Sequence, residues 1–239
     1  MHGFLVDAID CTSEVQELAQ SEGKEARLIF EDIPAELLLR TIMTCSRLWG
    51  VWRESHWDYY MQHLETASEN IVGRLVIANT NHVFGRADEY DSTRITPLFE
   101  KLRDKDGPPI SAPLREWCSF LGEELTLTGM MCFNACNKRK FFITRDGRMG
   151  IGPKIMREDD VLVILHWLRW PAVLRRSGTA HWMFLGTCYV DGIMDGELLR
   201  RCKCTGPHKG DRECAYERET EEAYLEHLQR KFDTVFELV

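Results

Sequence analysis

The 239-residue sequence lacks any apolar run close to the roughly 20 residues that are needed to cross a bilayer. Its start, Met1-His2-Gly3-Phe4, has neither the charged region nor the long apolar core of a secretory signal. It also lacks an excess of positive charge: it has 30 Lys and Arg residues and 38 Asp and Glu residues, which gives a formal net charge of −8. These absences predict a cytoplasmic protein that binds neither membranes nor nucleic acids.

The sequence also has no internal repeat and no low-complexity tract. Its nine cysteines are an odd number scattered along the chain, unlike the dense, even set of a small disulfide-stabilised secreted domain. We therefore expect most of them to be reduced thiols. The 44% of hydrophobic residues is enough for a substantial core, in one large domain or two small ones.

The first part of the chain, residues 1–137, has mainly helical patterns. Pro34 fits the first turn of a helix, and apolar residues recur at helical spacing after it. Further helices are predicted near 57–67, 94–103 and 113–137, the last opened by a proline. The apolar run 71–77 is compatible with either a helix or a strand, and periodicity alone does not decide between them.

From residue 138 the pattern changes to that of strands. Residues 141–144 are aromatic and β-branched, and Arg145-Asp146-Gly147-Arg148 is typical of a hairpin turn. Strands are also predicted at 161–165, 171–176 and 182–190. Residues 201–239 are predicted to form a cysteine-containing loop and a helix over 219–232.

The predicted fold is therefore α+β. We expect a helical N-terminal half, residues 1–137, to pack on a small antiparallel β-barrel or curled sheet formed by residues 138–200. The C-terminal helix would lie across that sheet.

The second half of the chain carries an ordered series of short motifs. Its most specific member is Tyr189-Val190-Asp191-Gly192-Ile193-Met194-Asp195-Gly196-Glu197, preceded by Phe141-Phe142-Ile143-Thr144, Gly152-Pro153 and Val173-Leu174-Arg175. This series resembles the C-terminal region of fungal heterokaryon incompatibility proteins, closely over 138–199 and loosely over 34–137. The resemblance implies a role in fungal nonself recognition.

Two departures from the family pattern accompany the resemblance. The family's Arg-x-Gly-Asp step stands here as Arg157-Glu158-Asp159-Asp160, and Asp191 occupies a position that is often His. Trp49-Gly50 lies in a helical pattern without the other signatures of the family's N-terminal effector domain. We therefore expect that domain to be absent.

No catalytic constellation is recognisable, so the leading hypothesis is a non-enzymatic regulatory or protein-interaction module. Its partner would be another protein, with a full-length heterokaryon incompatibility protein as the first candidate. The predicted binding residues are Trp167, Arg169 and Trp170, between two strands, because Trp and Arg are enriched at interaction hot spots. The motif adds Tyr189, Asp191, Asp195 and Glu197. An aromatic-rich core is the alternative explanation for the tryptophans.

Two chemical alternatives stay open. Asp191, Asp195 and Glu197 lie close together in sequence, and a pocket holding them would make the protein an enzyme or a small-ligand-binding protein. Turn and helix-capping roles also explain these acids. No cofactor is expected, except that one loop could bind zinc through four candidate ligands, Cys202, Cys204, His208 and Cys214.

Three further patterns favour structural roles. The run Gly147-x-x-Gly150-x-Gly152 is better explained by a hairpin than by a phosphate loop, because no helix is predicted to follow it. Cys132 and Cys136 fall on one helix face with apolar neighbours and are expected in the core. Cys188 is not surrounded by the signature of a catalytic nucleophile.

Overall fold

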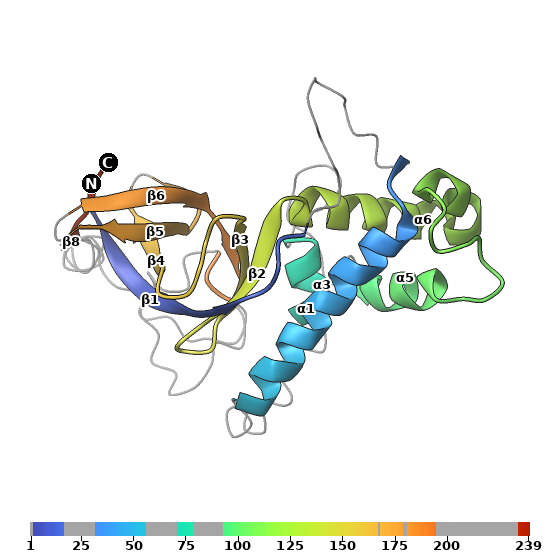
Figure 1. The fold of residues 1–239 in the computed structure, drawn as a ribbon, viewed down its shortest axis with the longest axis horizontal. Coiled ribbons are helices and arrows are strands. Elements are labelled where there is room, and N and C mark those ends of the chain that lie inside the picture. The colour runs from blue at the N-terminus through green and yellow to red at the C-terminus, as the bar shows by residue number, and fades with distance from the viewer. Residues whose placement is uncertain are drawn as a thin grey trace, which may run out of the picture.

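The computed structural model describes residues 2–16, 32–55, 71–78, 93–166, 168–178, 181–194 and 234–239. These residues form an α+β structure in which a curled sheet lies beside a group of helices (Figure 1). The helices are α1 (Ala35–Ser55), α3 (Ile71–Val76), α5 (Ile95–Leu102) and α6 (Leu114–Cys136). The strands are β1 (His2–Thr12), β2 (Arg139–Thr144), β3 (Met149–Pro153), β4 (Val161–Leu165), β5 (Ala172–Ser177), β6 (His181–Thr187), β7 (Tyr189–Val190), β8 (Thr234–Val235) and β9 (Glu237–Leu238).

The helices begin where the prolines predict. Pro34 and Pro113 directly precede α1 and α6, and Pro113 has an extended backbone with φ −65° and ψ 150°. Both helices bury an apolar stripe, which stabilises them by packing rather than by propensity. Gly122, with φ 78°, interrupts α6 and allows a kink that a residue with a side chain would resist. Of the run 71–77, for which the sequence left helix and strand open, residues Ile71–Val76 form helix α3.

The strands form a single sheet with the order β7-β3-β2-β1-β4-β5-β6-β9, and β8 pairs with β1. Pairing is antiparallel except between β6 and β9. The predicted hairpin joins β2 to β3, and Gly147 in its turn has φ 82°. The strands predicted at 161–165, 171–176 and 182–190 are present as β4, β5, and β6 with β7.

Strand β1 corrects the prediction that the N-terminal part would be mainly helical. It lies in the middle of the sheet, pairing Leu5 with Val163 of β4 and Ile9 with Thr144 of β2. Two register shifts interrupt it, so the inward and outward positions do not alternate simply. Leu5 is exposed while Asp7 is buried, the reverse of what their polarity suggests. The sequence of β1 therefore lacks the alternation of buried apolar and exposed polar residues that identifies a strand.

The sheet curls but does not close into a barrel. Strands β3 and β6 approach each other at Pro153 and Gly186. A Cβ atom added at Gly186 would lie only 2.9 Å from Cγ of Pro153. Gly186 has φ 145° and makes this approach possible, while Pro153 has no backbone N–H to donate across the gap. Of the two predicted shapes, the curled sheet is therefore the one observed.

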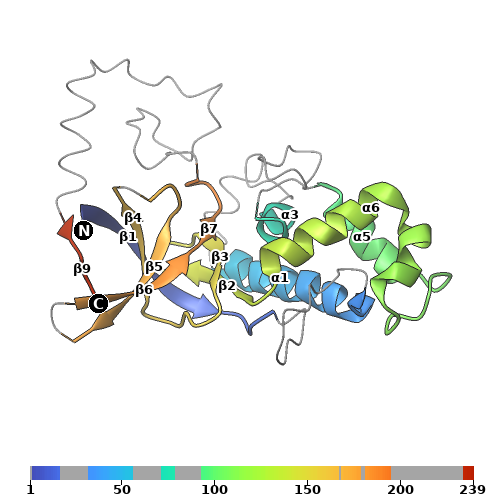
Figure 2. The ribbon, with the colours of Figure 1, turned by 90° about the horizontal axis from the view of Figure 1, so that it is seen from above.

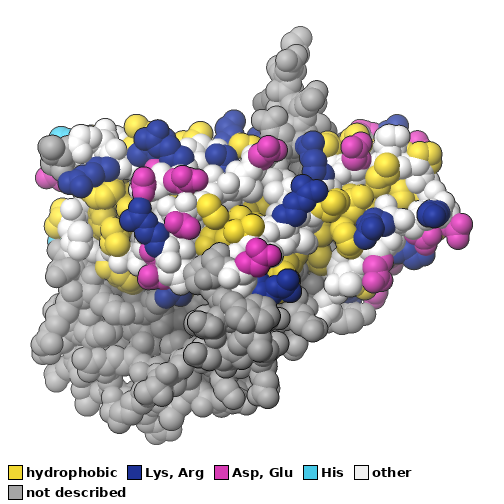
Figure 3. Space-filling model, turned by 60° about the horizontal axis from the view of Figure 1, so that its bottom comes forward, with side chains coloured by type: hydrophobic (Ala, Val, Ile, Leu, Met, Phe, Trp, Pro, Cys, Tyr) yellow, Lys and Arg dark blue, Asp and Glu magenta, His cyan; other side chains and the backbone are white. Residues whose placement is uncertain are grey.

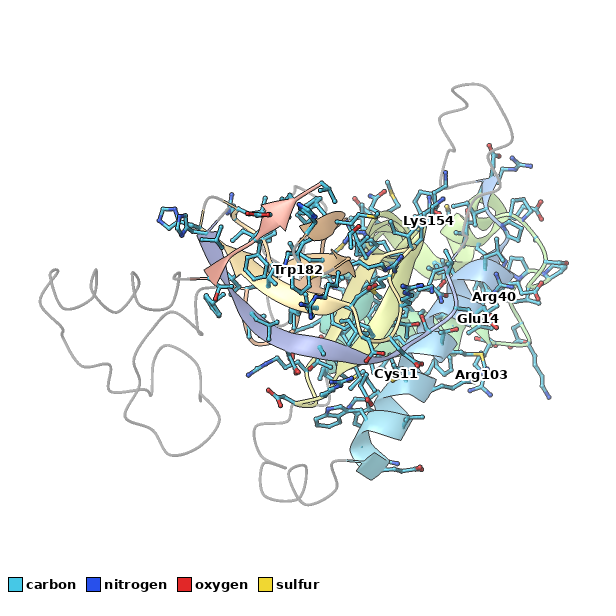
Figure 4. The ribbon with its side chains drawn as sticks, turned by 60° about the vertical axis from the view of Figure 1, so that its left-hand side comes forward. Cys11, Glu14, Arg40, Arg103, Lys154 and Trp182 are labelled. Carbon is cyan, nitrogen blue, oxygen red and sulfur yellow. The ribbon has the colours of Figure 1, made fainter. Side chains whose placement is uncertain are left out.

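Three apolar clusters hold the fold together. The largest joins the helices to one face of β2, β3 and β7 through Phe141, Ile151 and Tyr189. Cys11, on β1, packs against the same cluster at the helical end of the sheet (Figure 4). A second cluster, which includes Phe142 and Val173, lies within the curl. A third lies on the opposite face of β4 and β5 and includes Phe236.

The sheet extends beyond residues 138–200, because β8 and β9 join it from the C-terminal end of the chain and β1 joins it from the N-terminal end. Both ends of the chain lie at the same end of the sheet (Figure 1). The helix predicted at 219–232 and the one near 57–67 lie outside the described residues. None of the described helices is both long and apolar enough to span a membrane.

Candidate functional site

The motif residues Tyr189 and Asp191 meet an arginine from the helical part of the protein. Helix α3 carries Arg74, whose Nε donates to Oδ1 of Asp191 at 2.7 Å and whose guanidinium NH2 group donates to Oδ2 at 2.8 Å. The Tyr189 hydroxyl donates to the same Oδ1 at 2.9 Å. The carboxylate of Asp191 therefore accepts three hydrogen bonds from two parts of the chain.

This cluster is largely shielded from solvent. The side chains of Arg74 and Asp191 are 27% and 16% exposed. Burial lowers the pKa of Arg74, but hydrogen bonds and charge from Asp191 outweigh it, so the pKa lies above its ordinary value. Bidentate pairing of this kind fixes geometry as well as charge. Asp191 is thus committed to holding α3 against the end of β7.

The motif continues from this cluster into a tight turn. Gly192 has φ 79°, a conformation that favours glycine, and Ile193 is buried in the second apolar cluster. The backbone N–H of Val190 contacts Sδ of Met194 at 3.3 Å. Asp195 and Glu197 lie outside the described residues. The proposed carboxylate pocket therefore stays a prediction, with Asp191 already engaged elsewhere.

A second charged pair was not predicted. Asp160 is 2% exposed and accepts from Nε of Arg175 at 2.8 Å and from its NH2 group at 2.8 Å. The backbone N–H of Arg157 also donates to Asp160, at 2.7 Å. Hydrogen bonding to Asp160 raises the pKa of Arg175. Both residues belong to the motif series, but nothing in their spacing indicated that they pair.

The same loop explains the departure from the family's Arg-x-Gly-Asp step. Asp159 stands at the glycine position of that step and has φ 67°. Aspartate tolerates this left-handed conformation better than most residues with a side chain. The turn that the glycine would provide is therefore kept here, and Asp160 still closes it.

The predicted tip between β4 and β5 is partly described. Trp170 is 42% exposed, and the Arg169 guanidinium carbon lies 5.3 Å from the centre of the Trp170 ring. This separation is within the range of a cation–π interaction. Leu168 packs against the third apolar cluster, which anchors the tip. Trp167 lies outside the described residues.

Of the described cysteines, four are buried and two, Cys11 and Cys118, are half-buried. Cys132 and Cys136 are fully buried, as predicted, and the Cys136 thiol donates to the Val76 carbonyl at 3.0 Å. Cys188 is also buried, and burial raises its pKa, which opposes a nucleophilic thiolate. The zinc hypothesis rests on residues outside the described part, namely Cys202, Cys204, His208 and Cys214.

The glycine run of the β2–β3 hairpin serves packing. An added Cβ at Gly150 would lie 2.4 Å from Cζ of Phe142 and 2.6 Å from the Tyr189 carbonyl. The backbone of β3 is therefore pressed against neighbouring groups, and a strand rather than a helix follows the turn. This arrangement supports the hairpin interpretation over a phosphate loop.

The surface around these features is mixed in charge. In Figure 3, basic and acidic side chains are interspersed over the described part of the visible face, with apolar side chains between them. Within the described residues, no group of three or more His, Cys, Asp or Glu side chains is arranged to hold a metal ion. The described candidate features are thus a tightly bonded motif and an exposed Arg–Trp tip on the connection between β4 and β5.

These features define an α+β protein whose curled antiparallel sheet is tied to a helical part by the motif residues. Residues 115–205 match the family model described as the Het-6 beta-barrel domain. A stretch of 60 residues is 37% identical to "Heterokaryon incompatibility protein 6, OR allele" of Neurospora crassa, covering 24% of this chain and 9% of that protein. No solved structure matches. The chain therefore contains a region related to the heterokaryon incompatibility proteins.

Proposed function

We propose that the protein is a non-enzymatic interaction module that regulates a heterokaryon incompatibility protein by binding it. The observation that carries the proposal is the exposed pair Arg169 and Trp170, held on a short connection between two strands of the related region. Trp and Arg are both enriched among the few residues that contribute most of the binding energy at protein interfaces.

The rigidity of the surroundings supports this role. Leu168, next to the tip, packs against a buried cluster, and Ala172 just beyond it is fully buried in β5. A side chain presented on such a rigid support loses little conformational entropy on binding. Asp191, by contrast, already accepts three hydrogen bonds, which disfavours it as a catalytic base.

The test is a binding measurement with a purified full-length heterokaryon incompatibility protein, such as the Neurospora crassa relative. If the tip is a hot spot, Trp170→Ala weakens binding by at least about 2 kcal/mol, or about 30-fold. Met43→Ala is the matched control, because Met43 is a 36% exposed apolar residue on α1, away from the tip. Equal affinity of both variants and the wild type would reject the tip as the binding surface.

A further inference from the structure

Residues 234–239, named here the docked segment, join two strands that do not pair with each other. Through β8, His2 pairs with Val235 and Gly3 with Thr234, in antiparallel orientation. Through β9, Glu237 and Leu238 pair with the start of β6 in parallel orientation, and the Val239 N–H donates to the Trp182 carbonyl at 3.0 Å. The segment thus crosses from the start of β1 to the start of β6 (Figures 1 and 2).

One side chain anchors this segment. Phe236 is 1% exposed, and its ring lies 5.6 Å from that of Trp182 with an angle of 73° between their planes, an edge-to-face contact. Trp182 lies on β6 beside the docked segment (Figure 4). Phe236 completes the third apolar cluster, whose other buried members are Val163, Leu165, Ala172 and Leu174.

Apart from Leu238, which is partly buried and packs against the same cluster, the rest of the docked segment is exposed. Val235 and Val239 are 54% and 68% exposed, and Glu237 faces His181 at 3.6 Å in a pair whose side chains are both more than half exposed. Such an exposed pair contributes little. The segment is therefore held by backbone hydrogen bonds, one buried aromatic ring and the partly buried side chain of Leu238. Strand-addition peptides bind in the same way, with main-chain bonds for affinity and side-chain pockets for specificity.

We infer that the starts of β1 and β6 form a binding site for an extended peptide with a phenylalanine anchor, which the docked segment occupies within the chain. The partner that fits is a protein segment of the same chemistry: extended, with a phenylalanine that has an aliphatic residue directly before it and another two positions after it, as in Val235-Phe236-Glu237-Leu238. Such a segment binds by displacing residues 234–239. The Arg169–Trp170 tip is anchored on the same apolar cluster through Leu168, but Arg169 and Trp170 are not part of this site.

The experiment uses the full chain and a fluorescein-labelled peptide with the sequence of residues 234–239, followed by fluorescence anisotropy. In the wild type, the tethered segment competes for the site, whereas Phe236→Ala removes its anchor. The variant should therefore bind the peptide at least about ten-fold more tightly than the wild type. A peptide with Ala in place of Phe should bind the variant at least about ten-fold more weakly.

Either of two results would overturn the inference. One is the absence of saturable binding to a Phe236→Ala chain whose circular dichroism matches the wild type. The other is equal affinity for the Phe and Ala peptides. If Phe236→Ala does not fold, Leu238→Asp weakens docking through β9 while leaving the ring in place, and the same two results decide. Failure here leaves the binding measurement at Trp170 unaffected, so the two proposals are distinguishable.

Discussion

The bond between Arg74 and Asp191 should contribute measurably to stability, because it is shielded and bidentate. Removing one partner of a fully buried pair costs about 3 to 5 kcal/mol. Here the two side chains are 27% and 16% exposed, so solvent screens the remaining charge. We therefore expect Asp191→Asn and Arg74→Gln each to lower the free energy of unfolding by about 2 kcal/mol.

The double variant separates pairing from other effects. Because each single variant leaves one unpaired group, the double variant should lose less than the sum, with a coupling energy of about 1.5 kcal/mol in urea unfolding. The control is the pair Arg145–Asp159, at 2.5 Å but with side chains 60% and 81% exposed. Its coupling should stay below about 0.5 kcal/mol. A coupling energy for Arg74–Asp191 no larger than that of the control pair would show that the bidentate pair does not stabilise the fold.

Three further outcomes follow from the fold. Ile9 is fully buried in β1, so Ile9→Ala should cost about 2 to 5 kcal/mol in chemical denaturation, while Leu5→Ala, 51% exposed on the same strand, should cost under about 0.5. Equal effects would argue against β1 as a central strand. Asp159→Gly should raise the melting temperature, because φ 67° suits glycine and the lost ion pair is exposed; an unchanged or lower value would contradict this. Burial raises the pKa of the Cys188 thiol in the folded protein. The thiol therefore contributes fully to the free energy of unfolding below the pKa of the unfolded thiol, about 8.5, and this contribution falls by up to about 1.4 kcal/mol per pH unit above it. The free energy of unfolding should therefore fall less above that pH in Cys188→Ala than in the wild type. An equal fall would show that the Cys188 thiol does not cause this pH dependence.

The sequence was sufficient for features that depend on local chemistry. Proline at 34 and 113 marked the helix starts, and Asp146-Gly147 marked the hairpin. The α+β class followed from the change in periodicity at residue 138. For Trp170 the sequence left a tip and a core position open, and the structure shows it 42% exposed.

Features that depend on distant contacts were missed. Arg74 and Asp191 are 117 positions apart, and an arginine in a short apolar run gives no indication of its partner. Strand β1 was missed because its register shifts place Leu5 outward and Asp7 inward. Asp7 accepts a bond from the Asp146 N–H at 2.8 Å, a partner that becomes available only when β1 and the hairpin turn meet.

We propose that the related region binds another protein through its Arg–Trp tip. Amide hydrogen exchange of the full chain, with and without a purified full-length heterokaryon incompatibility protein, tests this proposal. We expect added protection at residues 168–172 and unchanged exchange around Met43 on α1. Complex formation with protection confined to the helical part would contradict it, as would the absence of any complex.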